Sequence, residues 1–219
     1  MNFVINKTIE EISDQISASI NHSLESGKKV LWFVSGGSVI SIEVLVAQKI
    51  NKDISSNLTV SLADERYGLV NHVDSNWFNL KKLGFDSFNF NAVTFLSGES
   101  FSDTGERINL ELKDVIKNSD YIIGMFGIGE DGHTAGILPH SDATESKELV
   151  CTYKTPKYDR ITITKNVIEM LDEAFVYSVG ENKREAIKKL QKEISAEEEP
   201  AQLLKEVPLL TIFTDYIKS

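Results

Sequence analysis

Residues 121–139, YIIGMFGIGEDGHTAGILP, carry the clearest structural signal in this chain. The apolar run at 121–126 predicts a buried strand. Gly127, Gly129 and Gly132 follow it, and glycines permit the backbone angles that a tight loop requires. In an open α/β sheet, small molecules bind where such loops leave the carboxyl ends of the strands. We therefore expect a ligand-binding loop directly after this strand.

Asp131 and His133 lie two positions apart in this loop. A histidine held at a strand end, with a carboxylate nearby, can take and return a proton near neutral pH. The alternative is that the histidine caps a helix or faces solvent, as loop histidines more often do. Two further strand-end loops of similar character favour the catalytic interpretation.

The first of these loops, Ser35-Gly36-Gly37-Ser38, lies between a predicted strand at 30–34 and a predicted helix at 41–50. Two glycines let the backbone turn sharply and approach a ligand closely. The start of a helix has unpaired N–H groups and a positive dipole end, which suit an anion. The lysine of a P-loop is missing, so a nucleoside triphosphate is not the natural ligand. The loop is either a phosphate cradle or a purely structural turn.

The second loop begins with Asp64 and Arg66, which follow a predicted strand at 58–63. The guanidinium of Arg66 presents a planar set of donors suited to a carboxylate or phosphate. Asp74 or Ser75, further along, can simply cap the next helix. Capping does not explain the run of charged residues DER at a strand end, so this loop is also a candidate binding element.

Two cations in the last third have similar positions. Arg160 begins a predicted strand at 160–163, and Lys183 follows a strand and a Gly180 turn at the start of a predicted helix at 181–193. We interpret both as candidate ligands for an anion. Three basic residues of that helix are expected to be solvated: Arg184, Lys188 and Lys189.

Helical and strand-like segments alternate along the chain, which favours a largely parallel central sheet flanked by helices on both faces. We expect a single α/β domain over residues 1–219, and a solvated acidic turn at 197–199. The predicted strands are 30–34, 58–63, 92–96, 121–126, 160–163, 174–179 and 208–213. The predicted helices are 8–26, 41–50, 75–83, 101–117, 165–171, 181–193 and 200–206.

Composition narrows the class of protein. The net charge of −10 disfavours nucleic acid as a partner, and an anionic substrate then needs a local cluster of positive groups. No apolar run approaches the roughly 18 residues of a membrane span, and the N-terminus lacks the pattern of a secretion signal. The single cysteine, Cys151, suits a reducing compartment. We expect a cytoplasmic monomer.

The ordered set of motifs SGGS, DER, HVDSN, GIGEDGHTAGILP, RITIT and VGENK resembles the 6-phosphogluconolactonases. The resemblance covers about residues 28–213. It implies the Rossmann-like fold of the sugar-phosphate isomerase, deaminase and lactonase group. It also implies hydrolysis of a phosphorylated sugar lactone, 6-phospho-D-glucono-1,5-lactone, to 6-phosphogluconate in the oxidative pentose phosphate pathway. That reaction needs no metal and no organic cofactor.

The resemblance implies catalytic roles for four residues. His133 is expected to be the general base that activates water and then returns the proton to the leaving ring oxygen. Asp131 or Asp64 would orient the imidazole or the sugar, and the resemblance does not decide between them. Arg66, or the N–H groups of a glycine loop, would stabilise the developing oxyanion.

The resemblance also implies the substrate ligands. The phosphate would bind the backbone amides of the SGGS loop, with charge from two basic side chains, and Asn76 would contact sugar hydroxyls. The expected substrate-binding residues are Gly36, Gly37, Ser38, Asn76, Gly129, Arg160 and Lys183. Relatives usually have Thr-Pro after the SGGS-like stretch, where this chain has Val39 and Ile40. A threonine hydroxyl is therefore absent, whereas the backbone amides do not depend on it.

A glucosamine-6-phosphate deaminase is the first alternative, since it would use the same phosphate loop and Asp64. The segment at 67–69, YGL, is less typical of lactonases than of these deaminases. Deaminases, however, typically have a tyrosine at the position of Arg66 and a glutamate five positions after the loop histidine, where this chain has Leu138.

A non-catalytic sugar-phosphate sensor is the second alternative. Such sensors are generally fused to a DNA-binding segment, and we expect none here because the chain has no spare length or basic region. The joint presence of His133, Asp131, Asp64 and Arg66 also favours an enzyme.

Overall fold

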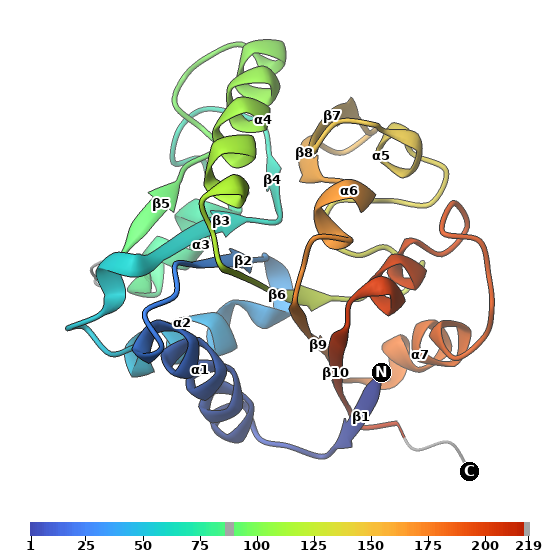
Figure 1. The fold of residues 1–219 in the computed structure, drawn as a ribbon. Coiled ribbons are helices and arrows are strands. Elements are labelled where there is room, and N and C mark those ends of the chain that lie inside the picture. Colours follow the sequence, from blue (N-terminus) through green and yellow to red (C-terminus); the bar gives the residue numbers. More distant parts are fainter. Residues whose placement is uncertain (86–89, 217–219) are drawn as a thin grey trace.

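Residues 1–85 and 90–216, which the computed structural model describes, contain a sheet of seven strands and a smaller sheet of three (Figure 1). In the large sheet β2 (Val30–Val34) is buried along its whole length, and β6 (Tyr121–Gly127) is buried at all but its two terminal residues. Both have the continuous apolar sequence of parallel strands that are covered on both faces. They pair directly, with Val30 opposite Tyr121.

The strand order of the large sheet is β1-β10-β9-β6-β2-β3-β5, and every pair of neighbours is parallel. The predicted parallel α/β sheet is therefore confirmed. The other strands are β1 (Asn2–Ile5), β3 (Leu58–Leu62), β5 (Asn91–Val93), β9 (Glu173–Ser178) and β10 (Leu209–Thr214). The first of these, β1, is not among the predicted strands.

The second sheet has the order β4-β8-β7 and is antiparallel. It consists of β4 (Asp64–Arg66), β7 (Val150–Lys154) and β8 (Asp159–Ile163). The predicted strand at 160–163 is therefore present as β8, but it lies outside the large parallel sheet. Because β4 follows β3 almost without interruption, it carries its charged residues onto β8, and Arg66 lies directly opposite Arg160.

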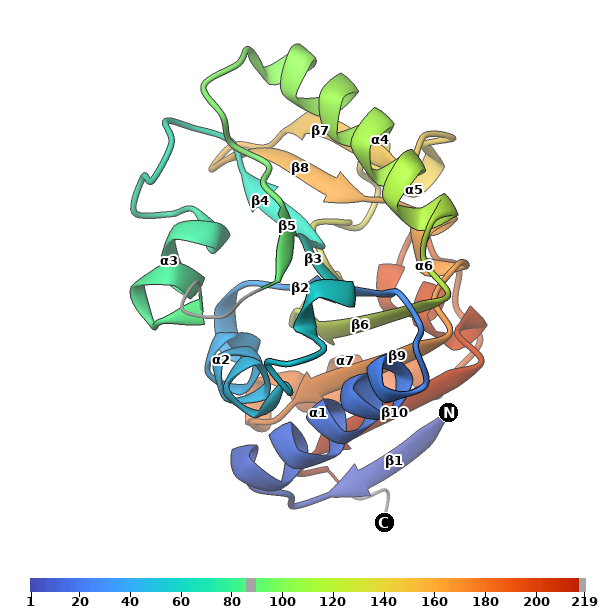
Figure 2. The same cartoon turned by 60° about the vertical axis from the view of Figure 1, so that its left-hand side comes forward.

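Helices cover both faces of the large sheet. α1 (Ile9–Glu25) and α2 (Ile40–Lys49) lie on one face, and α4 (Phe101–Lys117) lies with the second sheet on the other (Figures 1 and 2). The first helix begins at a capping box, in which the Thr8 side chain accepts from the Glu11 N–H and the Glu11 carboxylate accepts from the Thr8 N–H. The shorter helices are α3 (Asn76–Lys82), α5 (Asp142–Glu145), α6 (Lys165–Ile168) and α7 (Arg184–Leu190).

Two predicted helices differ in form from what the sequence indicates. The predicted helix at 181–193 is a 3₁₀ turn, Glu181–Lys183, followed by the seven-residue α7. The predicted helix at 200–206 is a 3₁₀ helix, Pro200–Glu206. The acidic turn before it is not fully solvated, because Glu199 is 5 % exposed and forms an ion pair with Lys189.

The chain leaves the centre of the sheet in both directions. From β2 it proceeds to β3 and β5, whereas from β6 it proceeds to β9 and β10 on the opposite side. The loops after β2 and β6 therefore diverge at the carboxyl ends of adjacent strands, which is the position where α/β sheets bind ligands. In the described ranges 1–85 and 90–216, no helix is long and apolar enough to cross a bilayer.

Candidate active site

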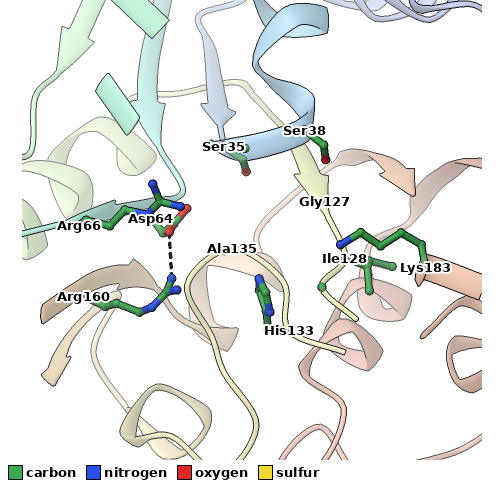
Figure 3. A pocket seen from close by; sticks show the side chains of 13 residues that line it. Ser35, Ser38, Asp64, Arg66, Gly127, Ile128, His133, Ala135, Arg160 and Lys183 are labelled. Atoms are coloured by element: carbon green, nitrogen blue, oxygen red, sulfur yellow. Dashed lines mark hydrogen bonds and ion pairs between the residues drawn. The ribbon is translucent and has the colours of Figure 1, made fainter. Parts of the chain in front are cut away.

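Loops from four neighbouring strands surround a cavity of about 160 Å³ at the carboxyl edge of the sheet (Figure 3). The loop after β2 forms one wall and the loop after β6 forms the opposite one. Figure 3 shows Lys183 at one side of the cavity and Arg66 with Arg160 at the other. The lining residues are Ser35, Gly36, Gly37, Ser38, Asp64, Arg66, Gly127, Ile128, Gly129, His133, Ala135, Arg160 and Lys183.

The loop after β2 presents backbone to the cavity. Gly36 is extended, and Gly37 has a φ of +71°, a conformation that glycine adopts without strain. A Cβ atom at Gly36 would collide with the side chain of Asn76, so the close packing there requires glycine. The loop continues through a short 3₁₀ turn into α2, whose first N–H groups have no partner within the helix. These features suit an anion.

A buried carboxyl group lies behind this loop. Glu43, in the first turn of α2, is 0 % exposed, and its Oε1 accepts a hydrogen bond of 2.6 Å from the Ser35 N–H. Burial raises the pKa of Glu43 well above its usual range, and the nearby charge of Asp64 raises it further. Burial thus favours the uncharged form of the Glu43 carboxyl, which holds the Ser35 N–H from behind the loop.

The loop after β6 is a tight structure stabilised by its own hydrogen bonds. The Gly129 N–H donates to the His133 carbonyl at 2.8 Å, and the Thr134 hydroxyl donates to the Gly127 carbonyl at 3.1 Å. Gly132 has a φ of +84°. Ala135 also has a positive φ, of +49°, which is unusual for a residue with a Cβ atom. The loop thus holds its side chains in one arrangement.

The imidazole of His133 is hydrogen-bonded to Asp131. Asp131 Oδ1 lies 2.5 Å from His133 Nδ1 and also accepts from the His133 N–H at 3.2 Å. The hydrogen bond from His133 lowers the pKa of Asp131 to about 2, against a partial opposing effect of burial. Because Nδ1 is engaged, Nε2 is the ring nitrogen left to exchange a proton with a ligand. Of the two carboxylates proposed from sequence, Asp131 is therefore the one in contact with the imidazole.

Asp64 lies across the cavity, in a different set of contacts. It is 5 % exposed, and its Oδ2 accepts from Arg160 at 3.4 Å. The Asn76 amide donates to the Asp64 carbonyl at 2.9 Å and to its carboxylate at 3.2 Å. Asn76 itself is 1 % exposed, lies behind Asp64 and lines a neighbouring groove. Its proposed contact with sugar hydroxyls stays a prediction.

The charged run DER contains one residue with a structural role. Glu65 is fully buried, and its carboxylate accepts from the backbone N–H groups of Arg66, Asn76 and Trp77 and from the Ser75 hydroxyl. It thereby caps the start of α3. Burial raises the pKa of Glu65, while these donors lower it in part. Of the two caps that the sequence suggests, Asp74 and Ser75, it is Ser75 that caps this helix, since its Oγ accepts from the Phe78 N–H at 3.0 Å.

The two arginines of the site are held in place but keep free donors. Arg66 Nη1 donates to the Asp74 carbonyl at 2.9 Å, and its guanidinium lies 5.5 Å from the centre of the Tyr158 ring. The Nε groups of Arg66 and Arg160 are buried and have no hydrogen-bond partner among the described residues. Together with Lys183 they form a local positive cluster in a chain of net charge −10.

Nearly all the residues proposed from sequence meet at this cavity. Asp131 stands behind His133, and Asn76 stands behind Asp64; the other nine line the cavity directly. The sequence did not point to Ile128 or Ala135, which line the cavity, or to Glu43 behind it. Apolar residues flank Glu43 in α2, and no pattern marks it as anything but a helix residue. Over residues 1–85 and 90–216, no three His, Cys, Asp or Glu side chains form a group suited to a metal ion.

The fold and the cavity define an α/β protein with a cavity lined by basic side chains and a histidine–aspartate pair at the switch point of its sheet. Residues 5–211 match the family described as glucosamine-6-phosphate isomerases/6-phosphogluconolactonase, and the chain belongs to this family.

The similar proteins include 6-phosphogluconolactonases and a glucosamine-6-phosphate deaminase. The chain is 27 % identical over 199 residues to a 6-phosphogluconolactonase of Haemophilus influenzae, covering 87 % of this chain and 86 % of that one. The crystal structure of a 6-phosphogluconolactonase from Shewanella baltica has a TM-score of 0.82 at 21 % identity, covering 98 % and 97 %. A monomeric glucosamine-6-phosphate deaminase has a TM-score of 0.77 at 22 % identity, with the same coverage. The shared fold alone does not distinguish the two activities.

Proposed function

We propose that this chain hydrolyses 6-phospho-D-glucono-1,5-lactone to 6-phosphogluconate in the oxidative pentose phosphate pathway. The observation that carries the proposal is the Asp131–His133 pair, which faces a cavity whose walls hold Arg66, Arg160 and Lys183. The named lactonase relative that aligns with 87 % of the chain supports this substrate.

His133 is the proposed general base. With Nδ1–H donated to Asp131, the lone pair of Nε2 takes a proton from water as the water oxygen forms a bond to the lactone carbonyl carbon. The carboxylate of Asp131 stabilises the imidazolium that results. The lowered pKa of Asp131, about 2, keeps that carboxylate ionised at any pH where the enzyme would work.

The tetrahedral intermediate then collapses. Its oxyanion is stabilised by Arg66, which lines the cavity, or by N–H groups of the glycine loops. The bond from the former carbonyl carbon to the ring oxygen breaks, and His133 returns its proton to that oxygen. One water is consumed, and the carboxylic acid formed releases one proton at neutral pH.

The phosphate is proposed to bind at the start of α2. Backbone N–H groups of Gly36, Gly37 and Ser38 would donate to it, and Lys183 and Arg160 would supply positive charge. On the opposite wall, glycine at position 129 leaves room for the His133 ring, because a Cβ atom there would collide with it. No metal, organic cofactor or nucleic acid enters this scheme, and we propose that the protein acts as a cytoplasmic monomer.

The direct test is hydrolysis of freshly generated 6-phosphogluconolactone, followed by proton release against a blank without enzyme. We expect rapid loss of the lactone in the wild type and loss of that acceleration in His133→Ala. Equal rates in the wild type and the blank would overturn the proposal.

The deaminase alternative is tested in the same assay series with glucosamine 6-phosphate and detection of ammonia. The likeness to a deaminase structure is the observation that keeps this alternative open. Against it stands Leu138, which has no titratable group at the position where deaminases have a glutamate. Binding of 6-phosphogluconate without turnover of either substrate would instead identify a sensor.

A further inference from the structure

A segment distant in sequence packs against the outer side of the catalytic loop. The Ala201 N–H donates to the Gly132 carbonyl at 2.9 Å, and the His140 N–H donates to the Glu197 carbonyl at 2.9 Å. These two backbone hydrogen bonds fix the loop that carries Asp131 and His133 at both its turn and its far end. The segment at 195–201, rather than the sheet, therefore supports this side of the proposed active site.

Glu199 is the buried charged residue of this segment. Its side chain is 6 % exposed, and one of its oxygens forms an ion pair with the Lys189 ammonium. The other oxygen lies against the α-carbon of Gly132, so closely that a Cβ atom at Gly132 would collide with it. Glu199 thus touches the turn between Asp131 and His133.

Lys189 links this carboxylate to the catalytic pair. Its side chain is 45 % exposed and extends from α7 toward Glu199. The hydrogen bond to Glu199 is the main cause of the raised pKa of Lys189, and the Asp131 carboxylate also contributes. Lys189 is therefore paired with Glu199 and also close enough to Asp131 for the two charges to interact.

We infer that Glu199 is a positioning residue for the proposed hydrolysis. It packs against the Gly132 turn and holds the Lys189 ammonium in an ion pair, so that Asp131 interacts with His133 rather than with Lys189. The inference rests on the proposed function for its kinetic readout and on the contacts above for its geometry. Without the Glu199 charge, the Lys189 ammonium is free to approach Asp131. A positive charge at that place opposes protonation of His133.

Glu199 and Lys189 can be substituted without changing a residue that lines the cavity. The other charged side chains around the imidazole keep their identity in such variants. The charged side chains that line the cavity with His133 are Asp64 and Arg66 on β4, Arg160 on β8 and Lys183 on the 3₁₀ turn after β9. Glu130 and Asp131 lie on the loop of His133 itself, and Lys189 and Glu199 lie on its outer side.

The test is the pH profile of kcat/KM for lactone hydrolysis in Glu199→Gln. We expect the acidic limb to move to lower pH by about half a unit, the size of effect expected from one partly screened charge. We expect kcat to fall about fivefold while KM changes less than twofold, because the phosphate ligands lie on other loops. The double variant Glu199→Gln/Lys189→Met should return the acidic limb to its wild-type position.

Glu198→Gln is the matched control, since it removes the same charge from an exposed neighbour in the same segment. It should leave the acidic limb unchanged. An acidic limb that stays in place in Glu199→Gln, or a shift that the Lys189 substitution does not reverse, would overturn the inference. A merely structural contribution of Glu199 would lower the melting temperature without moving the profile.

A second readout separates this inference from the proposed function. The imidazole titration of His133, followed by NMR and assigned with His133→Ala, requires no turnover. Its midpoint should move to lower pH in Glu199→Gln and return in the double variant. If the wild type fails to hydrolyse the lactone, the proposed function fails while this titration still tests the role of Glu199. An unchanged midpoint would overturn the inference even in an active lactonase.

Discussion

The loops after β2 and β6 face each other across one cavity but are built differently. The loop at 35–38 offers backbone amides. Its supporting carboxyl group, Glu43, is fully buried, and burial raises its pKa and so favours the uncharged form. The loop at 127–137 offers the imidazole of His133, held by the half-exposed, ionised Asp131. One wall is made of main chain and the other of charged side chains.

The difference shows which kind of support each chemistry needs. An amide cradle needs only glycines, a helix start and an uncharged anchor, all within ten residues of one another. The proposed proton-transferring pair needs its charges controlled, and we infer that this control comes from Glu199, more than 60 residues further along the chain. Substitutions in the first wall should therefore change substrate binding, and substitutions in the second should change turnover.

The largest effect is expected for His133→Ala. Loss of a general base typically costs 10²- to 10⁴-fold, and we expect kcat/KM for the lactone to fall about 1000-fold. Binding of 6-phosphogluconate, measured by calorimetry, should persist, because the loop after β2 is intact. A variant that keeps a tenth or more of wild-type activity would contradict the division between the two walls.

The next effect separates two adjacent glycines. Gly36→Ala places a Cβ atom against the buried Asn76 side chain and should raise KM at least about tenfold. Gly37→Ala meets no atom within 4 Å, and its φ of +71° should cost only about 1–2 kcal/mol of folding stability. Steady-state kinetics and thermal melting distinguish the two. Equal KM values for both variants would show that close packing at Gly36 does not shape the cradle.

Lys183→Met sharpens the comparison on the binding side. Removal of one positive charge from the cavity wall should raise KM about tenfold with little change in kcat. Lys192→Met, at an exposed position further along the chain, is the matched control and should leave KM unchanged. A fall in kcat with constant KM would instead place Lys183 in the chemical step.

The smallest effect concerns Glu43→Gln, which replaces a buried carboxyl group with a neutral amide of similar shape. The raised pKa means that the folded protein binds this proton more tightly than the unfolded chain does. Its stabilising contribution is complete below the usual value of 4.5 and is lost as pH rises through the raised value. The variant should therefore gain stability relative to the wild type as the pH is raised above about 5.

Thermal melting of Glu43→Gln and wild type across the pH range is the measurement. Glu198→Gln, an exposed glutamate, should show no such trend. A constant difference in melting temperature at all pH values would mean that Glu43 is ionised beneath the cradle, and the contrast between the two walls would weaken.

Local sequence patterns predicted the parallel part of the fold well, because buried strands are continuous apolar runs. The strands at 30–34 and 121–126 were placed within one residue. The strand β4 escaped prediction because its three residues, DER, are all charged and show no apolar alternation. Its pairing with β8 depends on a partner about 95 residues away, which no local pattern encodes.

The candidate site was predictable in its members but not in its contacts. Glycines and charges at strand ends identified the loops, whose convergence follows from parallel topology. The sequence does not distinguish Asp131 from Asp64 as the partner of His133, since both follow strands that end at the same edge of the sheet. The sequence predicted a solvated Glu199 because three consecutive glutamates usually lie in solvent, and its burial follows from contacts with Lys189 and Gly132 that are distant or unmarked in the sequence.

The position of β1 at the edge of the large sheet has a consequence for synthesis of the chain. Its neighbour in the sheet is β10, which joins it to β9. During translation the first strand is made about 200 residues before its pairing partner. Asn2–Ile5 therefore has no strand to pair with until β10 has been synthesised. Closure of that edge is thus a long-range event, of the kind that slows folding. In a nascent chain that stops before β10, β1 would have no pairing partner and β9 would have an open edge on the side that β10 covers.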